Sequence, residues 1–326
     1  MTGIFKHKTP GNIILLCVLA VLIKLPAFFH ETGFILKHSD GPLFVGLINW
    51  LKGFWGDRPV LLAISALVIN ISIASALTNF LNTERLVHKP NFLAGMSYIL
   101  ITSLLPSFNL LSSNLIASLL LFSAFALFYR SQHRRNNIFN AAFLTGLASL
   151  FFPPAVLFVF WAFLALAVIR PFKPAEWIGL VLGLLAPYYF YAAYLFLNDQ
   201  TSIPAYLYHL SFLSSSIAYS GWHALALFFL LAPLFAGIYY MQIGASKMLT
   251  QVKKGWYLLL AYLVTAIIVA LFDIEKTSEN MVLTLVPIAA FHGYGYLNAE
   301  LRLFPKISFW LTVAFIISNQ IWGHLW

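Results

Sequence analysis

Asp40 is the residue of this chain whose type and setting best suit chemistry. It follows His38 and Ser39 in a polar stretch and comes directly before the dipeptide Gly41-Pro42. A carboxylate at such a junction can act as a general base toward an acceptor hydroxyl, or bind a divalent cation. The position also suits a helix cap, because Asp and Ser accept hydrogen bonds from first-turn N–H groups and Pro is favoured there. The two roles are not exclusive.

Lys24 is a second candidate, because it is a cation near the end of a long apolar segment. Charge inside a membrane is costly, so an ammonium in this position is a functional candidate by default. Near the membrane surface it can neutralise a lipid phosphate. The alternative is that the side chain only extends to the surface along its own apolar stem.

The nine histidines are scattered and lack the close spacing of a membrane di-iron enzyme. His30 and His38 precede Asp40, and His209 and His223 belong to a later polar region. They are candidate ligands or substrate contacts, with solvated loop histidines as the commoner alternative, and we retain His38 and His209 as substrate-binding candidates. Phosphate-loop and Gly-x-Ser-x-Gly motifs do not occur in the sequence. With a single cysteine and no histidine cluster, we predict no dedicated metal centre beyond a possible role of Asp40.

Membrane-spanning helices must position these side chains. Hydrophobic residues make up 61% of the chain and charged residues 9%. About 20 consecutive apolar residues span a bilayer as a helix, because only helix hydrogen bonds satisfy the backbone there. We predict an all-α, polytopic transmembrane bundle of about eleven spans (ten to twelve), forming one integral membrane domain over residues 1–326. The expected spans are 11–29, 59–81, 92–106, 110–130, 138–152, 155–170, 177–197, 223–242, 257–272, 281–297 and 307–323.

The distribution of Lys and Arg predicts the orientation of this bundle. Most of the 19 basic residues fall in loops on one side, which the positive-inside rule makes cytoplasmic. These are Lys6, Lys8, Arg85, Lys89, Arg130, Arg134, Arg135, Arg170, Lys173, Lys247, Lys253, Lys254, Arg302 and Lys306. The N-terminus is therefore expected in the cytoplasm and Asp40 outside. Because the cations are spread over many short loops, they do not indicate a nucleic-acid partner.

Two long outer loops, 30–58 and 198–222, are each expected to contain a helix lying on the membrane. In the first loop, apolar residues at 43, 44, 47, 48 and 51 follow helical spacing, and Trp50 and Lys52 suit an interface. The second loop has an amphipathic stretch from Tyr206 to Phe212. Two such helices would roof a cavity that opens to the outer leaflet.

Gly179 and Gly183 form a Gly-x-x-x-Gly pattern within the expected span 177–197. Glycines at this spacing let two helices approach closely. We expect the partner to be another helix of the same chain, with dimerisation as the alternative.

The arrangement resembles the GT-C glycosyltransferases, which use polyprenyl-phosphate-linked sugars at the outer membrane face. In that family, an acidic catalytic residue in the first outer loop precedes a helix along the membrane, and here Asp40 precedes GPLFVGLINWLKGF. The stretches GMSYILITSLLPSFNLLSSNLIASLLLFSAFALFYR, NAAFLTGLASLFFPPAVLFVFWAFLALAV and ENMVLTLVPIAAF resemble later spans of the family. The chain also resembles an uncharacterised family of integral membrane proteins from Bacteroidetes, which implies no activity.

The GT-C resemblance implies a multi-pass enzyme, expected in the bacterial inner membrane, whose donor is a lipid-linked sugar. Asp40 would deprotonate or orient the acceptor, with a divalent cation at Asp40 as a possible cofactor. Lys24 and Lys276 would balance the charge of the donor phosphate, and Lys37 is a further substrate-binding candidate on the same side.

The chain also departs from the family pattern. Asp40 has no acidic neighbour, and Ser112, Ser113 and Asn114 stand where the family often has another acid. These departures favour the alternative of a non-catalytic scaffold, or a degenerate GT-C subunit with protein partners in the cell envelope. A lipid or small-solute transporter is a further alternative, although charged residues are nearly absent from the expected spans.

Overall fold

The computed structural model describes residues 2–7, 9, 11–28, 37, 39–55, 59–132, 134–199, 221–272, 278–301 and 303–322. Over these residues the fold is all-α and contains no strand, which confirms the predicted class. The α-helices are α1 (Thr2–Phe5), α2 (Gly11–Lys24), α3 (Pro42–Trp55), α4 (Pro59–Thr83), α5 (Leu93–Ile101), α6 (Ser113–Arg130), α7 (Asn137–Phe151), α8 (Phe158–Ile169), α9 (Pro174–Leu197), α10 (Gly221–Gly244), α11 (Thr250–Phe272), α12 (Val282–Asn298) and α13 (Phe304–Trp322). Short 3-10 helices join them: η1 (Leu25–Phe28), η2 (Pro106–Asn109), η3 (Pro153–Leu157), η5 (Ala245–Lys247) and η6 (Ser278–Met281).

Five helices of the described chain are long and apolar enough to cross a membrane, namely α4, α6, α9, α10 and α11. Shorter apolar helices occupy 11–24, 137–151 and 153–169. Much of the surface of the long helices is apolar and outward-facing, as in α9, where Phe190 is 63% exposed and Leu197 80%. Because exposed apolar side chains on this scale suit lipid and not water, the chain has the character of an integral membrane protein.

Each segment expected to be a span contains a helix, but α5 is much shorter than expected. Its nine residues correspond to about 14 Å of helix, which is about half the thickness of the hydrocarbon core of a bilayer. Every residue of α5 is buried. In α12, all residues from 282 to 296 are buried as well. These two helices therefore form the centre of the bundle.

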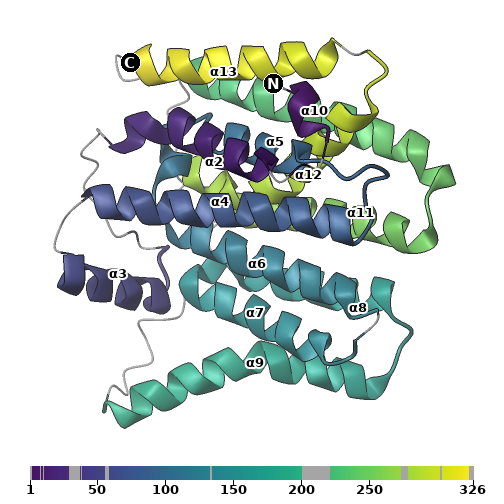
Figure 1. Ribbon diagram of the computed structural model, residues 1–326. Coiled ribbons are helices and arrows are strands. Elements are labelled where there is room, and N and C mark those ends of the chain that lie inside the picture. Colours follow the sequence, from purple (N-terminus) through teal and green to yellow (C-terminus); the bar gives the residue numbers. More distant parts are fainter. Residues whose placement is uncertain are drawn as a thin grey trace.

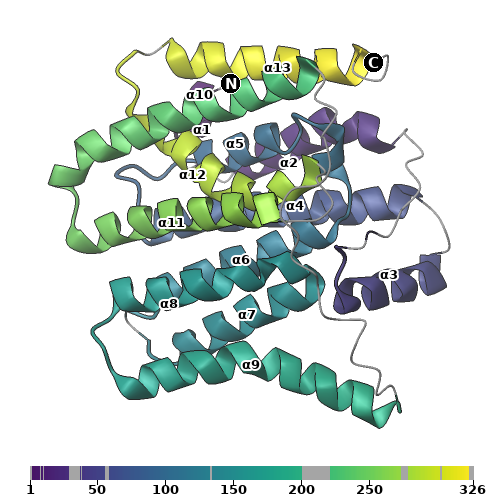
Figure 2. The ribbon, with the colours of Figure 1, turned by 180° about the vertical axis from the view of Figure 1, so that it is seen from behind.

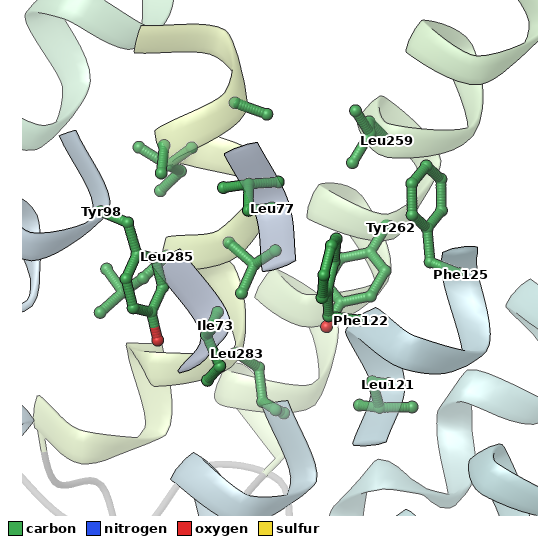
Figure 3. Close-up of a cluster of buried hydrophobic side chains, with 14 of the residues drawn as sticks. Ile73, Leu77, Tyr98, Leu121, Phe122, Phe125, Leu259, Tyr262, Leu283 and Leu285 are labelled. Carbon is green, nitrogen blue, oxygen red and sulfur yellow. The ribbon is translucent and has the colours of Figure 1, made fainter. Parts of the chain in front are cut away.

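The core is a continuous cluster of apolar side chains around α5 and α12. Figure 3 shows side chains of α4, α5, α6, α11 and α12 meeting in this cluster, with Tyr98 of α5 and Tyr262 of α11 both pointing into it. A glycine allows the two central helices to touch, because a β-carbon at Gly293 would lie 2.7 Å from the backbone of Ala94. His292 of α12 lies with Nε2 2.9 Å from the carbonyl oxygen of Leu230, which joins α12 to α10.

The chain passes back and forth between two ends of the bundle (Figures 1 and 2). In Figure 1, α3 and the last turns of α2 and α9 lie at the left end. The loops that join α6 to α7, α8 to α9 and α10 to α11 lie at the right end. Helix α3 and these three loops therefore lie at opposite ends of the bundle.

Candidate functional site

Asp40 lies at the end of the bundle where α3 begins, and its side chain is held by two hydrogen bonds. Its Oδ1 accepts a hydrogen bond of 2.6 Å from the Ser113 hydroxyl, at the start of α6. Its Oδ2 accepts one of 2.9 Å from the backbone N–H of Lys37. The Asp40 N–H in turn donates to the Lys37 carbonyl oxygen at 3.1 Å. The carboxylate thus closes its own turn and ties that turn to α6, while the residue stays partly exposed.

Gly41 fixes this turn against the end of α7. Its N–H donates a 2.8 Å hydrogen bond to the carbonyl oxygen of Phe151. A β-carbon at position 41 would overlap the carbonyl oxygen of Leu150, so only glycine allows the approach. Steric contact with α7 therefore explains why a glycine follows Asp40. The close approach places the Asp40 carboxylate between α7 and α6.

At the start of α6, Ser112 caps the helix and Ser113 contacts Asp40. Ser112 is the N-cap residue of α6, with extended backbone angles and a side-chain oxygen that accepts from the N–H of Leu115 at 3.3 Å. This leaves the next hydroxyl, that of Ser113, to bond with Asp40. Ser112 thus has the capping role, and Ser113 contacts the candidate catalytic residue.

A third segment, η6, reaches the same place through Lys37. The Nζ atom of Lys37 lies 2.5 Å from Oε2 of Glu279. Asn114 of α6 donates through Nδ2 to the carbonyl oxygen of Glu279 at 3.1 Å, and lies 3.5 Å from Oδ1 of Asn280. Lys37 and residues 39–41, 112–114 and 279–280 therefore form one polar cluster, which we call the α3 cluster.

The α3 cluster contains one atom that still lacks a hydrogen-bond partner. Asn114 is 4% exposed, and its Oδ1 has no hydrogen-bond partner among the described residues. A buried amide oxygen of this kind needs a donor, so it is a natural contact for a hydroxyl group of a bound molecule or for water.

Lys24 is buried in a separate set of contacts at the same end of the bundle. Its ammonium donates to the carbonyl oxygen of Thr102 at 3.3 Å and to Oδ1 of Asn109. Thr102 follows the last residue of α5, so the cation lies at the negative end of that helix dipole. The side chain of Asn319 in α13 donates to the Leu104 carbonyl oxygen at 2.8 Å. Lys24 thus stabilises the point where α5 stops, and its described partners are neutral oxygens.

The structure brings together only some of the predicted site residues. Asp40 and Lys37 share one turn, while Lys24 bonds to the segment after α5. His38, His209 and Lys276 lie outside the described residues. The described residues contain no group of three His, Cys, Asp or Glu that could hold a metal ion. Within the α3 cluster the Asp40 oxygens accept hydrogen bonds and Glu279 pairs with Lys37, so a divalent cation would have to replace these partners.

Sequence reasoning missed three members of the α3 cluster: Ser113, Glu279 and Asn280. In the sequence, Ser113 is singled out only because it stands where GT-C glycosyltransferases often have an acid. Glu279 gave a weak signal, because it is an acid immediately before an apolar span and faces the same predicted side as Asp40. Local spacing does not pair it with Lys37.

No family model matches the chain, and neither a curated protein nor a solved structure is significantly similar to it. The functional argument therefore depends on the residues of the α3 cluster and on the helices that hold them.

Proposed function

We propose that this chain is an integral membrane glycosyltransferase of the GT-C type, which transfers a sugar from a polyprenyl-linked donor at the outer face of the bacterial inner membrane. The observation that carries the proposal is the placement of Asp40. It is a partly exposed carboxylate at the start of α3, oriented by Ser113 and the Lys37 N–H, at the end of the bundle opposite the basic loops. The proposal includes eleven spans, a cytoplasmic N-terminus and an α3 that lies along the outer surface.

In the proposed reaction, Asp40 takes the proton of the acceptor hydroxyl as its oxygen attacks the anomeric carbon of the donor sugar. The bond between that carbon and the donor phosphate breaks, and the lipid phosphate leaves with the bonding electrons. A positioned base contributes about 10²–10⁴-fold in rate. Stabilising the charge that develops on the leaving phosphate is the larger requirement, and Lys37 is the described cation nearest in sequence to Asp40.

The distribution of apolar side chains on α3 supports its proposed place at the membrane surface. Phe44 and Ile48 are fully buried against the bundle, whereas Trp50 is 60% exposed and Phe54 71%. The rings of Trp50 and Phe54 lie 4.9 Å apart and form one exposed aromatic surface. Trp side chains favour the level of the lipid headgroups.

The proposal is tested by comparing cell-envelope glycans in deletion cells complemented with wild type, Asp40→Asn or Asp199→Asn. Asn keeps the size of Asp40 and can still accept from Ser113, but it is a far weaker base. Asp199 is an exposed acid at the end of α9 and serves as the matched control. We expect a glycan to be lost on deletion, restored by Asp199→Asn and not restored by Asp40→Asn at equal protein level. Full restoration by Asp40→Asn would remove the catalytic assignment.

A second candidate function, a non-catalytic scaffold in an envelope complex, is favoured by a different observation. Both Asp40 oxygens already accept hydrogen bonds, and Lys37 already pairs with Glu279, so the cluster satisfies much of its own polarity. Under this alternative the cluster joins three segments and has no substrate. It predicts that Asp40→Asn lowers stability but restores every phenotype of the deletion once expression is matched.

A further inference from the structure

A concentration of positive charge lies at the opposite end of the bundle from Asp40. Arg134 and Arg135 belong to the loop between α6 and α7, and Arg170 and Lys173 to the loop between α8 and α9. These loops lie at the right end of the molecule in Figure 1. Glu176, in the first turn of α9, joins them. We call these five residues the arginine corner.

Glu176 draws two guanidinium groups to the same carboxylate. Its side chain is only 2% exposed, with Oε2 3.3 Å from Nε of Arg170 and Oε1 4.0 Å from Nε of Arg135. Arg170 is further fixed by a 2.9 Å hydrogen bond from an Nη atom to the carbonyl oxygen of Ser131. One buried acid therefore lies close to two like charges, and a further anion would offset the repulsion between them.

The remaining charges of the corner increase this excess. Arg134 and Lys173 are exposed, and the Arg135 side chain is 60% exposed. Glu84, the described acid near the end of α6, is already paired with Arg130 at 2.6 Å. The corner therefore carries four cations and one acid, and its exposed guanidinium groups suit the bidentate binding of a phosphate.

An apolar surface adjoins these charges at the start of α9. Phe172, between Arg170 and Lys173, is 72% exposed, and its ring centre lies 5.5 Å from that of Trp177. Trp177 stacks in turn on Phe163 at 5.8 Å. This aromatic row lies where α9, one of the five helices able to cross a membrane, begins. A ligand here would meet the cations of the corner and this apolar surface side by side.

We propose that the arginine corner is a binding site for an anionic phospholipid, whose headgroup phosphate is held by Arg134 and Arg135 and whose acyl chain lies against Phe172. Charge complementarity selects an anionic headgroup over a zwitterionic one, because the excess positive charge is only partly offset by Glu176. The adjoining apolar surface selects a lipid over a soluble anion. The inference does not depend on the proposed transferase activity.

The test uses the full-length protein in nanodiscs of phosphatidylcholine, with and without phosphatidylglycerol. Because a ligand that binds only the folded state stabilises it, we expect phosphatidylglycerol to raise the thermal midpoint by about 2–4 °C. Inorganic phosphate added to the phosphatidylcholine sample distinguishes the two sources of the phosphate group. An equal rise with inorganic phosphate would mean that the corner binds a free anion, and would overturn the lipid assignment.

Two double variants assign the effect to the corner. Arg134→Gln/Arg135→Gln removes two of its charges, while Lys247→Gln/Lys306→Gln removes two exposed charges from η5 and from the first turn of α13. We expect the first variant to lose the phosphatidylglycerol shift and the control to keep it. A shift that survives in the first variant, or is lost equally in both, would contradict the proposal.

Native mass spectrometry of the wild-type protein supplies a measurement that does not depend on any variant folding. Protein released from an equal mixture of the two lipids should retain phosphatidylglycerol in excess of phosphatidylcholine. Equal retention would overturn the proposal.

Discussion

The ammonium of Lys37 lies 2.5 Å from the carboxylate of Glu279, and this ion pair joins residues 242 positions apart in the chain. The side chains are 23% and 13% exposed, so the pair is largely shielded from water. It links the turn that carries Asp40 to the segment before the central helix α12. The candidate catalytic residue is thus attached to the core of the bundle through Lys37 as well as through Ser113.

We expect Glu279→Gln to destabilise the protein by about 1–3 kcal/mol, because it leaves a largely buried ammonium without its counter-charge. The charge-reversed pair Lys37→Glu/Glu279→Lys should recover part of the loss, whereas either reversal alone should be worse than Glu279→Gln. The measurement is the thermal midpoint of the detergent-solubilised protein for all four variants. Additive effects in the double variant would show that the two residues do not interact.

Hydropathy predicted the all-α fold because the thickness of a bilayer dictates the length of an apolar run. Hydropathy did not predict the length of the helix in span 92–106, because α5 ends at Ile101. The hydroxyls of Thr102 and Ser103 bond back to carbonyl oxygens of α5, and Pro106 lacks a backbone N–H. A hydropathy average over about 20 residues does not detect these local interactions.

The sequence predicted the turn that carries Asp40 but not the distant residues that contact it. Asp40 stands out in the sequence because it is an acid directly before Gly41-Pro42 in the first predicted outer loop, although a helix cap also explains an acid at this position. Its partners Ser113 and Glu279 come from segments that only the tertiary fold brings near. Pairing of this kind depends on how α6 and α12 pack, and no spacing along the chain encodes it.

The neighbouring serines of α6 should respond differently to substitution by alanine. Ser113→Ala removes a 2.6 Å hydrogen bond to Asp40, and Ser112→Ala removes the N-cap of α6. Each should cost about 1 kcal/mol of stability. If Asp40 acts on a substrate, only Ser113→Ala should also reduce activity after correction for the folded fraction. Equal activity per folded molecule in the two variants would argue against a role for Ser113 in orienting the carboxylate.

For the Lys24–Asn109 hydrogen bond, we expect the loss of one partner to lower stability more than the loss of both. Asn109→Leu leaves a buried ammonium with the Thr102 carbonyl oxygen as its one described acceptor, and should cost about 1–3 kcal/mol. Adding Lys24→Met removes the stranded charge, so the double variant should be more stable than Asn109→Leu alone. Thermal midpoints of both variants test this order. A double variant less stable than the single one would mean that the Lys24 charge has an additional partner that stabilises the fold.

The Gly-x-x-x-Gly pattern of α9 contains two glycines that differ in their surroundings. A β-carbon at Gly183 would lie 2.6 Å from the carbonyl oxygen of Phe139 and 2.7 Å from the β-carbon of Ala142, both in α7. Nothing lies within 4 Å of such a carbon at Gly179. The pattern therefore serves packing within the chain at Gly183, as predicted, and Gly179 is free of that constraint.

Gly183→Ala should therefore separate α9 from α7 and cost about 1–3 kcal/mol, because a backbone carbonyl cannot move aside as a side chain can. Gly179→Ala should be neutral or stabilise the helix by up to about 1 kcal/mol, since alanine favours helix more than glycine does. The two variants differ by one turn of the same helix and share the same chemical change, so their difference in thermal midpoint isolates the contact with α7. A Gly179→Ala variant that is as unstable as Gly183→Ala would instead indicate that another molecule packs against Gly179, as in a dimer formed through this face of α9.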